Sequence, residues 1–225
     1  SSAPVRAGYH HGDLRNALIR AAAELAQAGG PGSVTIRAAA RSVGVTPTAA
    51  YRHFAGHEEL LHAAKEEALD QMSDVMGGEL LRVPETGDRV RRALYALAAI
   101  GRGYLTFAQA EPGLFRTAFA HCVDPGSPIE ENWDTGPFRR LTDAMDELVE
   151  AGYLPAERRP LADVAAWSAV HGLAMLYLDG PLRLSDAESR QRALERTIEV
   201  VIVGLGGKVL SADLRADLTE IVRDH

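Results

Sequence analysis

IRAAARSVGVTPTAAYRHF, residues 36–54, is the stretch that decides how the first part of this 225-residue chain is expected to fold. From Ile36 to Val43, apolar residues recur every three or four positions, as they do on one face of a helix. Gly44 can adopt a positive φ at little cost, which is typical of a tight turn. Thr46 followed by Pro47 indicates a new helix, because threonine caps a helix and proline fits its first turn. The stretch therefore predicts two short helices joined by a turn.

Two such helices form a helix-turn-helix when they pack closely, and small residues here suit that packing. Ala40 has no long side chain to obstruct the neighbouring helix, and Val43 and Val45 are expected to fill the small core. In this motif the first residues of the second helix face the base edges of a DNA major groove. A generic helical hairpin within a bundle would have the same spacing, so the spacing alone leaves both interpretations open.

The distribution of charge favours contact with nucleic acid near the N-terminus. Residues 1–65 contain seven Lys and Arg against four Asp and Glu, a net charge of +3. Since the whole chain carries −7, the other 160 residues carry −10. A basic head on an acidic body is what local DNA contact would explain, although chance fluctuation would also produce it.

Helical periodicity continues through the rest of the chain. Apolar residues from Leu14 to Leu25 predict a helix before the motif, and a longer helix is expected from Glu58 towards Gly77 and Gly78. Further helices are predicted at about 86–109, 112–121, 135–151, 160–179, 187–206 and 211–223, with glycine and proline between them. No stretch alternates at period two over the length of a strand. We therefore expect an all-α chain of about nine to ten helices, with a three-helix head and a larger helical bundle.

Composition and the absence of targeting patterns favour a cytoplasmic protein. Cys122 is the single cysteine, which excludes an intrachain disulfide and a cysteine-based zinc site and suits a reducing compartment. No apolar run approaches the roughly 18–20 residues of a membrane span. The first residues also lack the charged-then-apolar layout of a signal peptide.

No group of side chains indicates catalysis or a bound cofactor. Neither paired carboxylates nor a Ser/His/Asp arrangement stands out, so we expect no enzymatic activity. His53 and His57 are four residues apart, as metal ligands often are. Gly56 is expected to break the helix between them, and no third ligand is nearby, so we expect no metal site.

Four short motifs and a lead-in segment match the pattern of a known family. They are Ala39-Ala40, Gly44-Val45-Thr46, Tyr51-Arg52-His53-Phe54, Leu60-Leu61 and Gly8-Tyr9-His10-His11-Gly12-Asp13-Leu14-Arg15. On these residues, about 8–70 of the chain resembles the tetracycline-repressor-like (TetR, or AcrR-like) transcriptional regulators. The resemblance implies a ligand-responsive homodimer that binds a palindromic DNA operator, most often as a repressor. It also implies a helix-turn-helix domain at 8–57, a connecting helix and linker at 58–85, and a ligand-binding and dimerisation domain at 86–225.

The resemblance assigns DNA contacts to individual residues of the head. Family positions that commonly contact phosphates are occupied by Thr35, Thr46, Thr48, Tyr51 and His53. Candidates for base-edge or backbone contact are Arg37 and Arg52, candidates for thymine methyls are Pro47, Ala49 and Thr48, and Arg6 is a candidate for the minor groove or the backbone. Two positions depart from the pattern. His57 replaces a phosphate-binding lysine, which predicts a weak or pH-dependent contact, and Ala50 replaces a larger aliphatic residue, which predicts looser packing.

The body offers side chains for an apolar ligand pocket. The candidates are Tyr104, Phe107, Phe119, Met145, Trp167, His171 and Met175. Trp167, His171 and Met175 are predicted to share one helix face, with Gly172 allowing close approach. The Trp-x-x-x-His-Gly tract also resembles the C-terminal domain of one TetR-like subgroup. We expect a small, mostly apolar ligand oriented by one hydrogen bond from His171, or else a core stripe that contains a hydrogen-bonded histidine.

An apolar face within 187–206 predicts a dimer interface. It consists of Leu194, Ile198, Val201, Ile202 and Leu205. With residues 160–180, two copies would form a four-helix interface that places the heads on half-sites about 34–36 Å apart or a multiple of that. The same face could instead pack within its own subunit. For the whole protein, the alternative is a helical module that binds a small molecule or a protein and whose head does not bind DNA.

Overall fold

The computed structural model describes residues 11–120 and 136–206, which contain nine α-helices and no strand. The helices are α1 (His11–Gly29), α2 (Ile36–Val43), α3 (Pro47–Tyr51), α4 (His57–Leu80), α5 (Arg89–Ala110), α6 (Pro112–Ala118), α7 (Gly136–Glu150), α8 (Ala162–Leu178) and α9 (Ala187–Gly206). Short 3-10 helices lie at Pro31–Ser33 (η1), Ala156–Arg158 (η3) and Pro181–Leu184 (η4). The all-α prediction is confirmed. The helix predicted at 211–223, Cys122 and Arg6 lie outside the described residues.

Local signals place most helix ends close to the predicted positions. Asp88 starts α5, because its carboxylate accepts a hydrogen bond from the backbone N–H of Arg91 at 3.1 Å. The predicted end of α4 at Gly77 and Gly78 is wrong, because the helix continues to Leu80. A Cβ at Gly77 would lie 2.8 Å from the Nη2 atom of Arg140, so this glycine admits a side chain from α7 rather than ending the helix.

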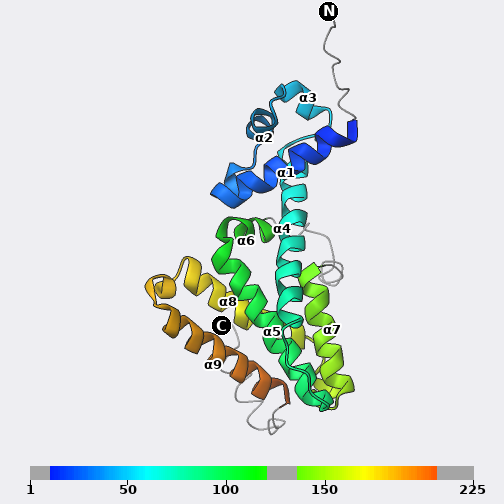
Figure 1. The fold of residues 1–225 in the computed structure, drawn as a ribbon, viewed down its shortest axis with the longest axis vertical. Helices are drawn as coiled ribbons and strands as arrows, with labels where there is room; N and C mark the ends of the chain where they lie inside the picture. Colours follow the sequence, from blue (N-terminus) through cyan, green and yellow to red (C-terminus); the bar gives the residue numbers. More distant parts are fainter. Residues whose placement is uncertain (1–10, 121–135, 207–225) are drawn as a thin grey trace, which may run out of the picture.

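The long helix α4 joins a small head to a larger body (Figure 1). Near its start it packs against α1, and further along it packs against α5, α6 and α7. A Cβ at Gly103 of α5 would lie 2.7 Å from the Cα atom of Met76, so the two backbones approach closely only because residue 103 is glycine. A displacement of the body helices around Met76 would therefore be transmitted to α4.

The last helix, α9, turns its predicted interface residues towards its own subunit. Those packed against the core are Leu194, Val201, Ile202 and Leu205. Ile198 also points inward, since its Cδ1 atom would lie 2.7 Å from a Cβ added at Gly101. On the opposite face Val200 and Val203 are each 61% exposed. The sequence pattern identified the apolar face correctly. In one subunit this face packs against the core and is largely covered, and the dimer interface assigned to it stays a prediction.

Candidate DNA-binding surface and internal cavity

The turn of the helix-turn-helix is built around Gly44. Its φ of 78° and ψ of 29° are left-handed, which confirms the predicted positive φ. The backbone N–H of Gly44 donates to the Arg41 carbonyl at 3.2 Å, and that of Val45 donates to the Ala40 carbonyl at 3.0 Å. This pair of bonds is the Schellman motif, which satisfies the last carbonyls of α2 and directs the chain into α3.

Two threonines cap the helices of the motif. The Thr35 hydroxyl accepts a hydrogen bond from the Ala38 N–H at 3.1 Å, and the Thr46 hydroxyl accepts one from the Ala49 N–H at 3.2 Å. The cap predicted at Thr46 is confirmed. Both residues are exposed, and each hydroxyl keeps its own hydrogen, which could be donated to a phosphate oxygen. The phosphate contacts themselves stay predictions.

Small buried residues hold the head together. Ala39 and Ala40 are fully buried, and Ala50 is only 1% exposed. Ala50 therefore belongs to the core of the head, and the looser packing expected there stays a prediction. Val43 and Val45 are half-buried and pack against the same core. Close approach of the three helices thus depends on alanine at the contact points.

Arg15 of α1 joins the three helices to the start of α4, a role that the sequence pattern did not reveal. Its guanidinium carbon lies 4.4 Å from the ring centroid of Phe54, and its Nη1 atom donates to the His53 carbonyl. The same side chain is paired with Glu59 at 3.4 Å. Glu59 in turn accepts the Ala55 N–H at 2.7 Å. The segment between α3 and α4 is therefore held by charged hydrogen bonds.

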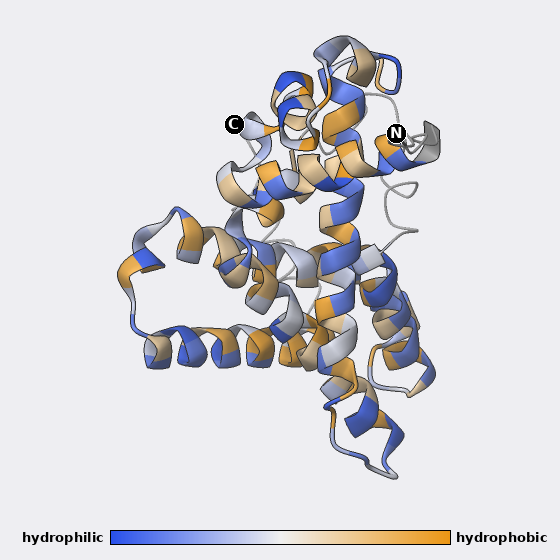
Figure 2. Cartoon of the chain, turned by 45° about the horizontal axis from the view of Figure 1, so that its top comes forward, coloured by the Kyte–Doolittle hydropathy of each residue, from blue (hydrophilic) through white to orange (hydrophobic). Residues whose placement is uncertain are grey.

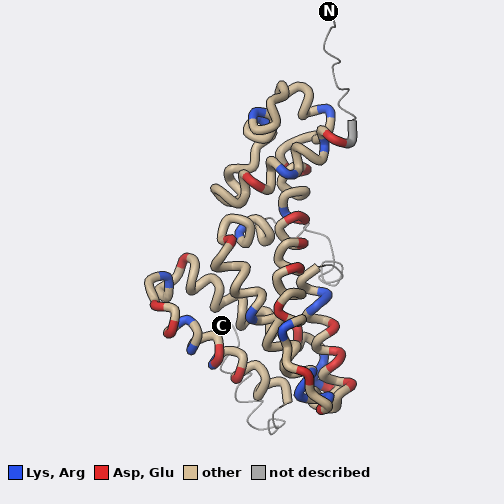
Figure 3. Tube along the Cα trace, viewed as in Figure 1, with Lys and Arg blue, Asp and Glu red and all other residues tan. Residues whose placement is uncertain are grey.

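The outer surface of α2 and α3 carries positive charge without negative charge. Residues 33–57 include Arg37, Arg41 and Arg52 but no Asp or Glu. All three arginines are exposed. Figure 3 shows basic residues on α2 and at the end of α3, whereas acidic residues are numerous along α4, α7 and α9. A polyanion would thus be attracted to this end of an otherwise acidic molecule.

Most of the residues predicted to contact DNA lie on this surface. Those that are exposed are Thr35, Arg37, Thr46, Pro47, Thr48, Tyr51, Arg52 and His57. Ala49 and His53 are half-buried. Tyr51 is 53% exposed, so its ring and its hydroxyl donor are both accessible from outside. Together these residues place several hydrogen-bond donors on α3 and beside it, where phosphates or base edges could accept from them.

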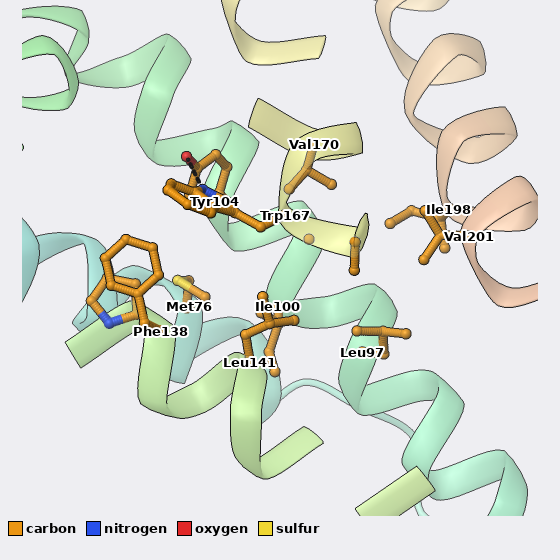
Figure 4. Close-up of a pocket in the computed structure, with 13 residues that line it drawn as sticks. Met76, Leu97, Ile100, Tyr104, Phe138, Leu141, Trp167, Val170, Ile198 and Val201 are labelled. Carbon is orange, nitrogen blue, oxygen red and sulfur yellow. Dashed lines mark hydrogen bonds between the residues drawn. The ribbon is translucent and has the colours of Figure 1, made fainter. Parts of the chain in front are cut away.

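An apolar cavity lies in the body, between α4, α5, α7, α8 and α9 (Figure 4). It is lined by Met76, Leu97, Ile100, Gly101, Tyr104, Pro137, Phe138, Leu141, Ala166, Trp167, Val170, Ile198 and Val201. None of these residues is charged. The cavity volume is about 30 Å³, room for roughly two water molecules. A larger occupant would have to move its walls apart.

A hydrogen-bonded trio borders this cavity. The Trp167 Nε1–H donates to the Tyr104 hydroxyl at 3.0 Å, and that hydroxyl lies 2.7 Å from the His171 Nδ1 atom. The hydroxyl can donate its hydrogen to Nδ1 when the His171 proton is on Nε2, or accept from Nδ1–H in the other tautomer. Burial lowers the pKa of His171, which agrees with a neutral ring.

The predicted ligand-binding residues separate into three groups. Tyr104 and Trp167 line the cavity, and His171 reaches it through Tyr104. The ring of Phe119 lies 4.8 Å from that of His171, whereas the core residues Phe107 and Met145 are fully buried and do not line the cavity.

Met175 and Gly172 depart from their predicted roles. Met175 is 37% exposed and does not line the cavity, since residues eight apart differ by about 80° around a helix and Met175 lies to one side of Trp167. The predicted close approach at Gly172 is also wrong within the subunit, since no described atom lies within 4 Å of a Cβ added there. Their helix face is open to solvent instead.

Sequence reasoning missed the part of the cavity wall that comes from other helices. Met76 and Ile100 had no assigned role, and Ile198 and Val201 were assigned to a dimer interface. Figure 4 shows Ile198 and Val201 extending from α9 toward the other lining residues. Apolar periodicity indicates that such residues are buried, but it does not distinguish a cavity wall from an interface.

The described ranges 11–120 and 136–206 contain no cluster of three or more His, Cys, Asp or Glu residues that could hold a metal ion. Within the same ranges, no helix has both the length and the apolar character that crossing a membrane requires.

Two family models match this chain. Residues 18–64 match the model described as bacterial regulatory proteins, tetR family, and residues 97–201 match the tetracyclin repressor-like C-terminal domain. The first match contains the helix-turn-helix, and the second contains most of the residues that line the cavity. No curated protein matches the chain.

Solved structures have the same fold at low sequence identity. A protein of unknown function from Rhodococcus sp. RHA1 is 22% identical with a TM-score of 0.71, and the match covers 90% of this chain and 100% of that one. A putative tetR family transcription regulator from Shewanella sp. PV-4 is 18% identical with a TM-score of 0.58, covering 83% and 97%. A TetR family regulator from Marinobacter aquaeolei VT8 is 18% identical with a TM-score of 0.59, covering 83% and 94%.

Proposed function

Since the chain belongs to the TetR family of bacterial transcription regulators, we propose that it is a ligand-responsive repressor that binds a palindromic operator as a homodimer. DNA binding is assigned to residues 8–57, ligand binding and dimerisation to 86–225, and the connection between them to 58–85. The observation that carries the proposal is the exposed surface of α2 and α3, which has three arginines, an exposed tyrosine and no acidic residue.

The side chains of this surface suit two kinds of DNA contact. Thr48 and Tyr51 have hydroxyl donors for phosphates, which fix the position of the head without reading sequence. Arg37 and Arg52 can pair with the two acceptors of a guanine edge in the major groove. Capping of α3 by Thr46 holds its first residues in a defined orientation, so base contacts there do not first require the helix to form.

The experiment that tests DNA binding starts with a footprint on the DNA that flanks the gene of this protein. Tyr51→Ala should weaken binding to all sequences, and Arg37→Ala should cost about 1–3 kcal/mol and relax base preference at one position. Affinity should fall steeply with added salt, because phosphate contacts release counterions. Matched controls are Tyr95→Ala and Arg82→Ala, which remove an exposed tyrosine and an exposed arginine far along the chain from the head.

Wild-type affinity in folded Tyr51→Ala and Arg37→Ala proteins would contradict the assignment. If no DNA is protected at low salt, a head that binds protein becomes the better interpretation. An increase in transcription from the protected promoter when the protein is present would contradict the repressor role alone.

A second copy of the chain is proposed to cover the outer faces of α8 and α9. On α8 this surface includes Gly172, Met175 and Leu176, and on α9 it includes Val200 and Val203. Apolar side chains beside an open glycine would allow two helices to approach closely. We prefer this surface as the dimer interface to the one predicted around Leu194 and Ile198, because Leu194 and Ile198 face the core of their own subunit.

The proposed ligand is small and mostly apolar, and it enters the cavity beside Trp167. Because the cavity is small, the ligand must displace its walls, and Met76 of α4 is one of them. Displacement of α4 would change the position of the heads in the dimer and so weaken operator binding. A coupling of about 1–3 kcal/mol, or roughly 5–150-fold, is typical of such linkage.

A further inference from the structure

A second pocket lies on a different face of α5 from the apolar cavity. It is lined by Arg102, Leu105, Thr106, Gln109, Tyr177, Ser185, Ala187, Arg190, Gln191 and Leu194. The lining therefore combines two arginines, neutral polar side chains and apolar ones, with no acidic residue. Its volume is about 370 Å³, so it admits a small organic molecule without the movement that the apolar cavity requires.

Arg190 stands on the inward face of α9, one turn before Leu194. Its Nη1 atom donates to the Gln109 side-chain oxygen at 3.3 Å, and its Nη2 atom donates to the Arg183 carbonyl at 2.7 Å. Its guanidinium carbon lies 5.6 Å from the ring centroid of Tyr177. Two neutral acceptors and an aromatic ring, from three different elements, thus hold this cation in the wall of the pocket.

The charge of Arg190 has no counter-ion in the described part of the chain. No carboxylate there lies within ion-pair distance of it, and its Nε atom is buried without a hydrogen-bond partner. The two acidic residues nearest in sequence are engaged elsewhere, since Glu188 pairs with Arg192 and Asp186 accepts the Ser189 N–H at 2.7 Å. The other arginine of the pocket, Arg102, is paired with Glu79 at 3.5 Å. Holding a cation partly out of water without an anion is unfavourable.

We propose that this pocket binds a small organic carboxylate. Arg190 holds the carboxylate, because a planar guanidinium presents donors in the geometry that a carboxylate accepts. Leu194, with the edges of the buried residues Leu105 and Tyr177, contacts the hydrocarbon part of the ligand. These apolar walls favour an organic carboxylate over inorganic phosphate, which has no apolar part to bury. The site shares neither Trp167 nor the DNA-binding surface, so its occupancy is tested without DNA.

The test is calorimetric titration and thermal unfolding of the full chain with benzoate and hexanoate at constant ionic strength. The neutral amides, benzamide and hexanamide, have the same shapes without the charge. We expect the carboxylates to bind and raise the melting temperature, and the amides to bind at least tenfold more weakly. Arg190→Gln should abolish carboxylate binding. Arg192→Gln, which removes a charge from the exposed side of the same helix, should leave it unchanged.

Gln109→Glu tests the proposal even if Arg190→Gln does not fold. It places a carboxylate on the side chain that Arg190 already contacts, so it should raise the melting temperature of the ligand-free protein and block benzoate. Equal binding of amides and carboxylates, equal binding by Arg190→Gln, or undiminished benzoate binding by Gln109→Glu would overturn the proposal. Phosphate binding as tight as that of benzoate would overturn the preference for organic carboxylates.

Discussion

Gly44 is the residue at which the backbone of the helix-turn-helix has to leave the helical region. Replacing it with alanine puts a Cβ on a residue with φ of 78°. We expect Gly44→Ala to lower the free energy of unfolding by about 1–2 kcal/mol, the usual cost of a left-handed conformation for a residue with a side chain. Urea unfolding followed by circular dichroism measures it.

Gly32→Ala is the matched control for this substitution. Both glycines are exposed, and no described atom lies within 4 Å of a Cβ added at either, but only Gly44 has a positive φ. Gly32→Ala should be neutral or slightly stabilising, because alanine reduces the freedom of the unfolded chain. Equal stability of the two variants would show that the turn tolerates a different geometry.

His171 makes the stability of the body depend on pH. Burial lowers its pKa, so as pH falls the unfolded chain takes up a proton near the ordinary value of about 6.5 while the folded protein still resists protonation. Stability from this group is therefore present above that pH and is lost as pH falls below it. We expect the melting temperature to fall more between about pH 7.5 and 5.5 in the wild type than in His171→Asn.

Asparagine suits this comparison because its side-chain oxygen can accept the Tyr104 hydroxyl hydrogen without titrating. Melting temperatures measured at both pH values, with near-ultraviolet circular dichroism as a check on packing, give the difference directly. An identical drop in the two proteins would mean that His171 does not contribute to the pH dependence.

At the scale of elements, substitutions on the two faces of α9 should affect different properties, dimer formation on the outer face and stability of the subunit on the inner face. Figure 2 shows hydrophilic residues in its first turns and hydrophobic ones toward its end. Val203 is exposed near that end, so Val203→Glu should leave the subunit folded but separate the proposed dimer. Operator affinity should then fall by at least about tenfold, or 1.4 kcal/mol, because two separate heads no longer bind the two half-sites as one linked unit. Light scattering measures the mass and fluorescence anisotropy the affinity.

Two substitutions distinguish this effect from general damage. Val201→Glu places a charge on the inward face of the same helix and should lower the melting temperature instead. Leu81→Glu changes a side chain at the end of α4 that is 90% exposed and should alter neither mass nor stability. A wild-type protein that is monomeric at micromolar concentration would remove the basis for the proposed interface.

At the scale of the whole molecule, the cavity and the DNA-binding surface are joined by α4. Ala166→Leu adds volume to a wall of the cavity and should imitate the ligand by pushing the helices apart. We expect operator affinity to fall by roughly 5–150-fold, with a stability cost of about 1–3 kcal/mol from overpacking. Fluorescence anisotropy with the footprinted operator measures the change.

Ala110→Leu makes the same substitution at an exposed position at the end of α5 and should leave operator affinity unchanged. If Ala166→Leu folds and binds the operator as tightly as the wild type, the cavity does not control the heads. The DNA-binding assignment would stand in that case, because it depends on a different surface.

The sequence by itself determined the features that depend on neighbouring residues. The turn could be predicted from Gly44 alone, because glycine adopts a positive φ at little cost. The helix cap could be predicted from Thr46 alone, because its hydroxyl reaches a backbone N–H three residues away. The helices and the family resemblance follow from short-range patterns of this kind. The DNA contacts still rest on that resemblance, although most of the side chains concerned are exposed as expected.

Only the tertiary structure decided what each apolar face meets. A period of 3.6 residues shows that Ile198 and Val201 share a face, but not whether that face is covered by α5 and α8 or by another subunit. The cavity, the exposure of Met175 and the isolated charge of Arg190 all follow from how helices far apart in the chain pack together. Burial is a property of the assembled helices, so no local pattern could have assigned these residues.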